Sequence, residues 1–277
     1  MTHSKKDLDA QIEESIQFIR SKTSAQPKSA IILGSGLGSF ADTLDDLIKI
    51  PTKEIPHFPV STVQGHSGNF VFGQLSGKSV LALQGRTHYY EGHDISRVAY
   101  VVRLMAELGV RNLLVTNASG GVNPRFKPGD LMVIDDQINM MFRNPLRGPV
   151  VKGEIRWPDM NHAYDPEISD LIEKIGLEQG IALKRGVLYV STGPTYETAA
   201  EVRMIQKLGG DAASMSTVPE VIVARARGIR VGGISCITNH ATGISPTPLS
   251  HEEVTEIANQ VKDKFQKLIK EVLIQIS

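Results

Sequence analysis

An apolar run that stops in a cluster of glycines constrains the fold of this chain more than any other stretch. Residues 29–33 read Ser-Ala-Ile-Ile-Leu, and residues 34–38 follow as Gly-Ser-Gly-Leu-Gly. This pattern predicts a buried strand that turns sharply into a helix, which we expect to reach about Leu47. Such a turn points backbone N–H groups beyond the strand, where they favour an anion, and Ser35 adds a hydroxyl there. Taken alone, a purely structural tight turn explains the stretch equally well.

Composition narrows the class of protein. We find no linker that divides the 277 residues, so we expect a single domain over residues 1–277. Lys and Arg (30) balance Asp and Glu (30), and no basic cluster indicates a nucleic-acid partner. The apolar runs are strand-sized and the first residues are polar, so we expect neither a membrane span nor a signal peptide. The lone Cys236 fits a reducing cytoplasm, and the histidine spacing indicates no metal site.

Short apolar runs alternate with helical patterns along the chain. Predicted strands cover residues 29–33, 70–75, 80–84, 112–116, 131–135, 186–190, 212–215 and 231–238. Beyond the helix after the glycines, predicted helices cover residues 8–19, 98–108, 166–179, 198–208 and 219–228, with one long helix after residue 250. Residues 140–163 lack such a pattern, and long segments of this kind usually carry function or contact a partner. The alternation predicts an α/β fold, a single domain whose mixed central β-sheet is flanked by helices on both faces.

Polar side chains follow several of the predicted strands. Arg86 and His88 come after the strand at 80–84, while Ser35, Ser216 and the backbone N–H of Ala118 lie at other strand ends. In α/β sheets ligands collect beyond the carboxyl ends of the strands. A guanidinium binds two phosphate oxygens at once, and hydroxyl, imidazole and backbone N–H groups donate to others. The set therefore suits phosphate, although each serine taken alone is also a common turn or cap residue.

A second group suits a planar heterocycle. Glu197 stands in the segment 193–201, and Asn239 follows the last predicted strand. A carboxylate accepts hydrogen bonds and a carboxamide both accepts and donates, so together they read the edge of a ring that carries N–H and C=O groups. Tyr196 supplies an aromatic face. The competing interpretation makes Glu197 a first-turn carboxylate of a helix and Asn239 a turn residue.

Six motifs occur in order along the chain: residues 34–38, 85–92 (Gly-Arg-Thr-His-Tyr-Tyr-Glu-Gly), 117–121 (Asn-Ala-Ser-Gly-Gly), 193–198 (Gly-Pro-Thr-Tyr-Glu-Thr), 215–220 (Met-Ser-Thr-Val-Pro-Glu) and 237–239 (Ile-Thr-Asn). The set resembles the trimeric, inosine–guanosine type of purine nucleoside phosphorylase, from about Ser29 to the final helix. This resemblance implies the nucleoside phosphorylase fold and a pentosyltransferase of purine salvage. It also implies inosine and guanosine as substrates, inorganic phosphate as co-substrate and no cofactor.

The resemblance also implies residue roles. The catalytic residues would be Asn239, Glu197 and His88. Phosphate would be held by Ser35, Arg86, His88, the Ala118 backbone and Ser216, with His66 near the phosphate entrance. The purine would be held by Tyr196, Glu197 and Asn239, and the ribose would face Tyr90, Met215 and His251. Trp157 would lid the neighbouring subunit's site in a homotrimer. Ser119 and His240 depart from the family pattern, and we assign them no role.

These residue types fit one chemical account. A bound phosphate beneath C1′ needs orientation rather than a base. Asn239, donating to N7, would stabilise the charge that the leaving purine gathers in the transition state. Glu197, accepting from N1–H, would select 6-oxopurines, because a 6-aminopurine offers a lone pair there.

Three rival hypotheses stay open at this stage. A methylthioadenosine phosphorylase would share the fold and the phosphate site, but we expect an aspartate where Asn239 stands. A dinucleotide-dependent oxidoreductase would explain the glycine turn and could use Glu54, yet Ser39 stands where G-x-G-x-x-G needs its last glycine. A non-enzymatic nucleoside-binding protein would need no phosphate site.

Overall fold

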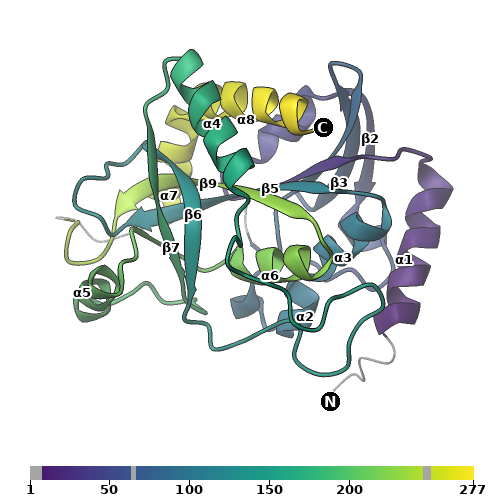
Figure 1. Cartoon of the computed structure of the whole chain (residues 1–277), viewed down its shortest axis with the longest axis horizontal. Helices are drawn as coiled ribbons and strands as arrows, with labels where there is room; N and C mark the ends of the chain where they lie inside the picture. Colours follow the sequence, from purple (N-terminus) through teal and green to yellow (C-terminus); the bar gives the residue numbers. More distant parts are fainter. Residues whose placement is uncertain (1–7, 64–66, 246–250) are drawn as a thin grey trace.

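A mixed sheet runs through the part of the chain that the computed structural model describes, which is residues 8–63, 67–245 and 251–277, with the backbone only at 251–254. It has nine strands in the order β2-β3-β4-β1-β5-β8-β7-β6-β9 (Figure 1). The strands are β1 (Ser29–Leu33), β2 (Asp45–Pro51), β3 (Asn69–Leu75), β4 (Lys78–Gln84), β5 (Asn112–Gly121), β6 (Leu131–Asn139), β7 (Leu183–Val190), β8 (Ala212–Ser214) and β9 (Arg230–His240). The predicted mixed sheet is therefore confirmed.

Half of this sheet closes on itself. Strand β5 pairs with β8 in antiparallel and with β9 in parallel orientation. Strand β9 pairs with β6, β6 with β7 and β7 with β8, so these five strands form a ring. The sequence patterns did not predict the ring, because closure depends on pairing between strands about 100 residues apart. Its effect is to bring the carboxyl ends of β5 and β9 beside the short strand β8.

Helices cover both faces of the sheet, as predicted (Figure 1). They are α1 (Leu8–Lys22), α2 (Ile95–Val98), α3 (Tyr100–Glu107), α4 (Pro166–Glu178), α5 (Ala199–Leu208), α6 (Val218–Ala226), α7 (His251–Gln260) and α8 (Lys262–Ile276). Alternate residues of β1 point to opposite faces: Ala30 and Ile32 join the core formed with α1, α3 and α6, whereas Ile31 and Leu33 join the core formed with α4 and α8. No helix among the described residues has the length and apolar character needed to cross a membrane.

The prediction of a helix after the glycine turn is wrong. The chain forms a short 3₁₀ helix at Gly38–Thr43 and then the edge strand β2, which pairs antiparallel with β3. Ile48, Lys49 and Ile50 alternate between apolar and polar with the period of a strand. Pairing with β3 stabilises this strand more than the helical spacing of the preceding residues stabilises a helix. Gly73 of β3 permits this approach, since a Cβ there would lie 2.6 Å from the Cβ of Leu44.

The long helix predicted after residue 250 is also divided. Helix α7 ends at Gln260 and α8 begins at Lys262; the backbone of Val261 between them (φ −96°, ψ 0°) stays in the right-handed region but departs from ideal helical angles. The apolar stripe nevertheless continues across the break: Ala258, Val261, Phe265 and Leu268 are all buried against the sheet.

Candidate active site

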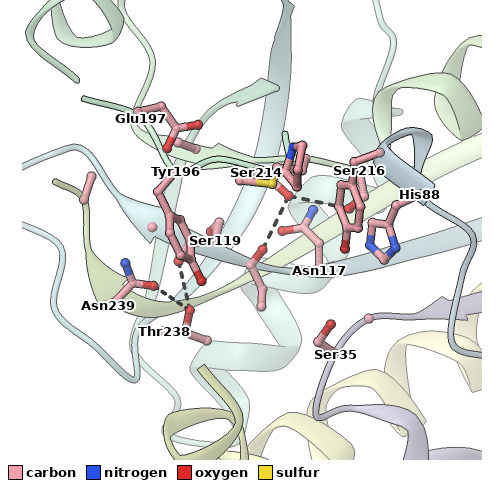
Figure 2. Close-up of a pocket in the computed structure, with 18 of the residues that line it drawn as sticks. Ser35, His88, Asn117, Ser119, Tyr196, Glu197, Ser214, Ser216, Thr238 and Asn239 are labelled. Carbon is pink, nitrogen blue, oxygen red and sulfur yellow. Dashed lines mark hydrogen bonds between the residues drawn. The ribbon is translucent and has the colours of Figure 1, made fainter. Parts of the chain in front are cut away.

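A cavity of about 310 Å³ opens where the carboxyl ends of β1, β4, β5, β8 and β9 meet. Of the residues singled out from the sequence, it is lined by Ser35, Arg86, His88, Tyr90, Ala118, Tyr196, Glu197, Met215, Ser216 and Asn239. Figure 2 shows them in two groups, with Ser35, His88 and Ser216 at one end and Tyr196, Glu197 and Asn239 at the other. We call these the phosphate end and the base end. The predicted convergence of both groups on one hollow is therefore present.

The glycine turn after β1 brings the backbone against its neighbours. A Cβ on Gly34 would lie 2.8 Å from Cα of Asn117 in β5, so only glycine fits there. Gly36 has a φ of +74°, and a Cβ there would lie 2.5 Å from that of Ala258 in α7. The turn therefore packs between β5 and α7 and sets Ser35 on the cavity wall.

Arg86 has an acidic partner far away in the sequence. Its Nε and Nη2 donate to the two carboxylate oxygens of Glu220 in α6, both at 3.0 Å, and the two side chains are 2% and 1% exposed. Its Nη1 donates to the carbonyl of Thr116 (2.6 Å) and to Oγ of Ser216 (3.3 Å). Burial raises the pKa of Glu220, and the neighbouring guanidinium opposes this. The two-pronged edge of Arg86 that we expected to hold phosphate thus faces Glu220, while the side chain still lines the cavity.

His88 is held by a carboxylate three residues later. Its backbone N–H donates to Oε1 of Glu91 (2.6 Å), and its Nδ1 lies 3.3 Å from the same oxygen. Burial alone would raise the pKa of Glu91, but hydrogen bonds from His88 and Thr62 lower it to about 2. The imidazole also stacks on Tyr90, with ring centroids 4.8 Å apart. Glu91 therefore stays ionised at neutral pH and fixes the orientation of the His88 ring.

A β-bulge shapes the base end. In the pairing of β5 with β9, Ser119 lies opposite Ile237 and Gly120 lies opposite Asn239, so Thr238 is an extra residue. In a regular strand Thr238 and Asn239 would point to opposite faces, whereas the bulge lets both line the cavity. Asn239 accepts from Thr238 Oγ1 and donates to the carbonyl of His240, both at 3.0 Å. Its NH₂ group has two hydrogens, so one of them can serve a ligand atom.

Glu197 is not a capping residue. Helix α5 begins at Ala199, and Thr198 and Glu201 form its capping box. The carboxylate of Glu197 instead accepts a hydrogen bond from Ser191 Oγ (3.2 Å) and lines the cavity. Burial raises the pKa of Glu197 above its ordinary value. The helix-dipole interpretation is therefore wrong, and the carboxylate faces the cavity beside Tyr196.

Comparison with known proteins shows the family of this chain. Residues 28–274 match the model of the phosphorylase superfamily. The chain is 51% identical to purine nucleoside phosphorylase 1 of Geobacillus stearothermophilus over 263 residues, which cover 95% of this chain and 96% of that protein. The chain belongs to the purine nucleoside phosphorylase family.

Solved structures of purine nucleoside phosphorylases have the same fold. The Schistosoma mansoni enzyme in complex with inosine superposes with a TM-score of 0.90 at 37% identity, covering 95% of each chain. A Schistosoma mansoni purine nucleoside phosphorylase in complex with adenosine gives a TM-score of 0.90 at 38% identity, covering 95% of this chain and 96% of that one. The predicted single-domain nucleoside phosphorylase fold is confirmed.

Three residues expected at a purine nucleoside phosphorylase site are not seen in this cavity. Trp157 is 85% exposed and lines a separate hollow with Arg156 and Asn139, so it does not reach the cavity of its own chain. His66 lies outside the described residues, and so does the side chain of His251. Their predicted roles stay predictions.

Sequence reasoning missed three residues that shape the phosphate end. Glu220 is the one carboxylate in the mostly apolar helix α6, and such a residue usually has a buried partner. Glu91 follows His88 at the spacing of a capping box, which is a recognisable local signal. Thr217 has a positive φ of +80°, and no sequence signal announces such a conformation at a β-branched residue.

Proposed function

We propose that this chain cleaves the N-glycosidic bond of 6-oxopurine ribonucleosides and deoxyribonucleosides with inorganic phosphate, as a step of purine salvage. The observation that carries this proposal is a single cavity with two chemically different ends. Ser35, His88 and Ser216 stand at one end, and Glu197 and Asn239 stand at the other. A phosphorolysis needs both ends, because the anion and the nucleoside must lie against each other when they react.

At the phosphate end the side chains orient the nucleophile. A phosphate oxygen forms a bond to C1′ while the bond from C1′ to the purine nitrogen breaks, and the electron pair leaves with the purine. The sugar passes through an oxocarbenium-like transition state, as in glycoside hydrolysis. Because phosphate is already an anion at neutral pH, the hydroxyl and imidazole donors need only hold it below the ribose, which Tyr90 and Met215 face.

At the base end the side chains hold the purine. Asn239 donates to N7, where negative charge grows as the bond breaks, so this hydrogen bond strengthens in the transition state. Glu197 accepts from N1–H of a 6-oxopurine. A 6-aminopurine lacks that hydrogen and would leave the carboxylate unpaired. The Schistosoma mansoni complex with inosine supports this substrate class, and the complex with adenosine makes adenosine the competitor to test.

The deciding experiment incubates the purified chain with inosine, with and without phosphate. We expect hypoxanthine and ribose 1-phosphate only when phosphate is present, similar turnover of guanosine, and much slower turnover of adenosine. Nucleoside binding without base release would instead support a non-enzymatic binding protein. Base release without phosphate would indicate a hydrolase.

We further propose that the chain works as a homotrimer in the cytoplasm, with Trp157 covering the neighbouring subunit's cavity. Large apolar side chains are exposed along the irregular segment 140–163: Phe142 (77%), Val150 (51%), Ile155 (57%) and Trp157 (85%). Exposed apolar groups gathered in one segment usually mark a protein interface. The molecular mass in solution tests this part of the proposal independently of activity.

A further inference from the structure

The turn between β8 and α6 has an unusual backbone at Thr217. Its φ is +80° and its ψ is −52°, and the N–H of Val218 donates to the carbonyl of Ser216 at 3.0 Å. This is a γ-turn of the rare, positive-φ kind, and a β-branched residue adopts it only when its surroundings hold it there. Thr217 is 1% exposed and does not line the cavity. Its neighbour Ser216 does.

A buried chain of hydrogen bonds holds the Thr217 side chain. The Nδ2 of Asn117 in β5 donates to Thr217 Oγ1 at 2.9 Å. On the other side, the hydroxyl of Ser235 donates to Oδ1 of Asn117, and Ser119 Oγ lies 3.0 Å from Ser235 Oγ. Ser119, which departs from the family pattern, therefore takes part in this series of hydrogen bonds rather than turning its hydroxyl toward the purine. All four side chains are at most 4% exposed.

This series of hydrogen bonds has a direction, because a carboxamide donates only from its nitrogen. Thr217 Oγ1 accepts from Asn117, so its own hydrogen can go to Ser216 Oγ, which lies 3.3 Å away. Ser216 Oγ also receives Nη1 of Arg86 at 3.3 Å, and a guanidinium only donates. A hydroxyl oxygen that accepts from two donors sends its own hydrogen elsewhere. The remaining directions are Ser214 Oγ at 3.5 Å and the cavity.

We propose that Thr217 is a positioning residue for phosphate. Asn117 fixes its hydroxyl in the strained turn, the hydroxyl donates to Ser216, and Ser216 therefore turns its own hydrogen toward a phosphate oxygen. The proposal rests on the proposed function and deepens it. Thr217 thus contributes to phosphate binding although its side chain touches neither phosphate nor nucleoside.

The test is a double-mutant cycle read in Michaelis constants. Thr217→Gly removes the hydroxyl while glycine tolerates the positive φ, so the turn itself is kept. We expect the KM for phosphate to rise about tenfold, since one hydrogen bond to an anion is lost, with the KM for inosine unchanged. In a Ser216→Ala background the same substitution should have no further effect. Thr217→Ser, which restores the hydroxyl, should restore the phosphate KM.

Two further variants separate this effect from a general disturbance of the fold. Ser76 also has a positive φ (+50°) but lies in the β3–β4 turn, so Ser76→Gly is the matched control. Thr217→Val keeps the shape without the hydroxyl, and it should behave as Thr217→Gly does. An unchanged phosphate KM in Thr217→Gly, or an equal loss in the Ser216→Ala background, overturns the proposal alone. A wild-type chain without phosphate-dependent turnover overturns the proposed function and this proposal together.

Discussion

At the phosphate end Arg86 is 3% exposed and paired with Glu220, whereas at the base end Tyr196 is 42% exposed and Glu197 is half-buried. The two ends of the cavity thus differ in how far a single chain buries their side chains. Side chains at the phosphate end already have charged or hydroxyl partners. At the base end Glu197 accepts from the hydroxyl of Ser191 and Asn239 from that of Thr238. We expect these side chains to gain further partners from the nucleoside and, in the homotrimer that we propose, from a neighbour.

The elements behind each end explain this difference. The phosphate end is built by β1, β4 and β5, which both main cores cover, and by the mostly apolar helix α6. The base end combines Asn239 of β9 with the segment between β7 and α5, which carries Tyr196 and Glu197. A small separate cluster, which includes Tyr189, Val202, Ile205 and Ala213, supports that segment. Substitutions at the phosphate end should therefore cost stability as well as activity, and those in the segment between β7 and α5 should cost activity alone.

The largest effect on activity is expected at Glu197. Glu197→Ala removes the acceptor for N1–H, and we expect turnover of inosine and guanosine to fall by a factor of ~10⁴, by analogy with sites built around one substrate hydrogen bond. The unfolding temperature should stay close to that of the wild type, because this carboxylate is half-buried and makes one hydrogen bond to Ser191. Full activity in Glu197→Ala would remove this residue from base recognition.

The pH dependence of kcat/KM for inosine tests the role of Glu197 in a second way. The ionised carboxylate accepts from N1–H more strongly than the protonated carboxyl group does, so inosine binding should weaken as the pH falls through the pKa of Glu197, which burial raises. In Glu197→Gln the acid limb that belongs to this group should disappear from the profile of kcat/KM. An unchanged limb assigns the titration to phosphate or to another side chain.

The largest effect on stability is expected at Glu220. Glu220→Ala leaves the buried guanidinium of Arg86 without its partner, and breaking a buried pair in this way costs about 3–5 kcal/mol of the free energy of unfolding. Glu220→Gln should cost less, because its amide oxygen still accepts from Arg86. Urea unfolding followed by circular dichroism measures both. If Glu220→Ala unfolds at the wild-type urea concentration, the phosphate end is less dependent on this pair than its geometry indicates.

Asn239 should show a smaller, purely kinetic effect. Asn239→Ala removes a donor whose hydrogen bond strengthens as charge develops on the purine. We expect kcat for inosine to fall about 10²–10³-fold with little change in KM. Steady-state kinetics at saturating phosphate separate the two constants. A loss seen only in KM would make Asn239 a ground-state binding residue.

The sequence predicted the features that depend on neighbouring residues and missed those that depend on distant ones. The strand at Ser29–Leu33 and the polar residues beyond the strand ends were recognisable, because apolar runs and glycines are local signals. The pair of Arg86 with Glu220 joins residues 134 positions apart, and the extra residue Thr238 exists only relative to its partner strand. The edge strand β2 was misread as helix because pairing with β3 decides its structure.

The smallest effect, and the one that most directly tests the open base end, is expected at Trp157. If this side chain covers a neighbour's cavity, Trp157→Ala should raise the KM for inosine about three- to tenfold through the lost aromatic contact, and leave the KM for phosphate unchanged. Leu177 in α4 is 82% exposed, so Leu177→Ala is the control for removing an exposed apolar group. Unchanged inosine kinetics in Trp157→Ala, together with a monomeric mass in solution, would mean that one chain completes the base end by itself.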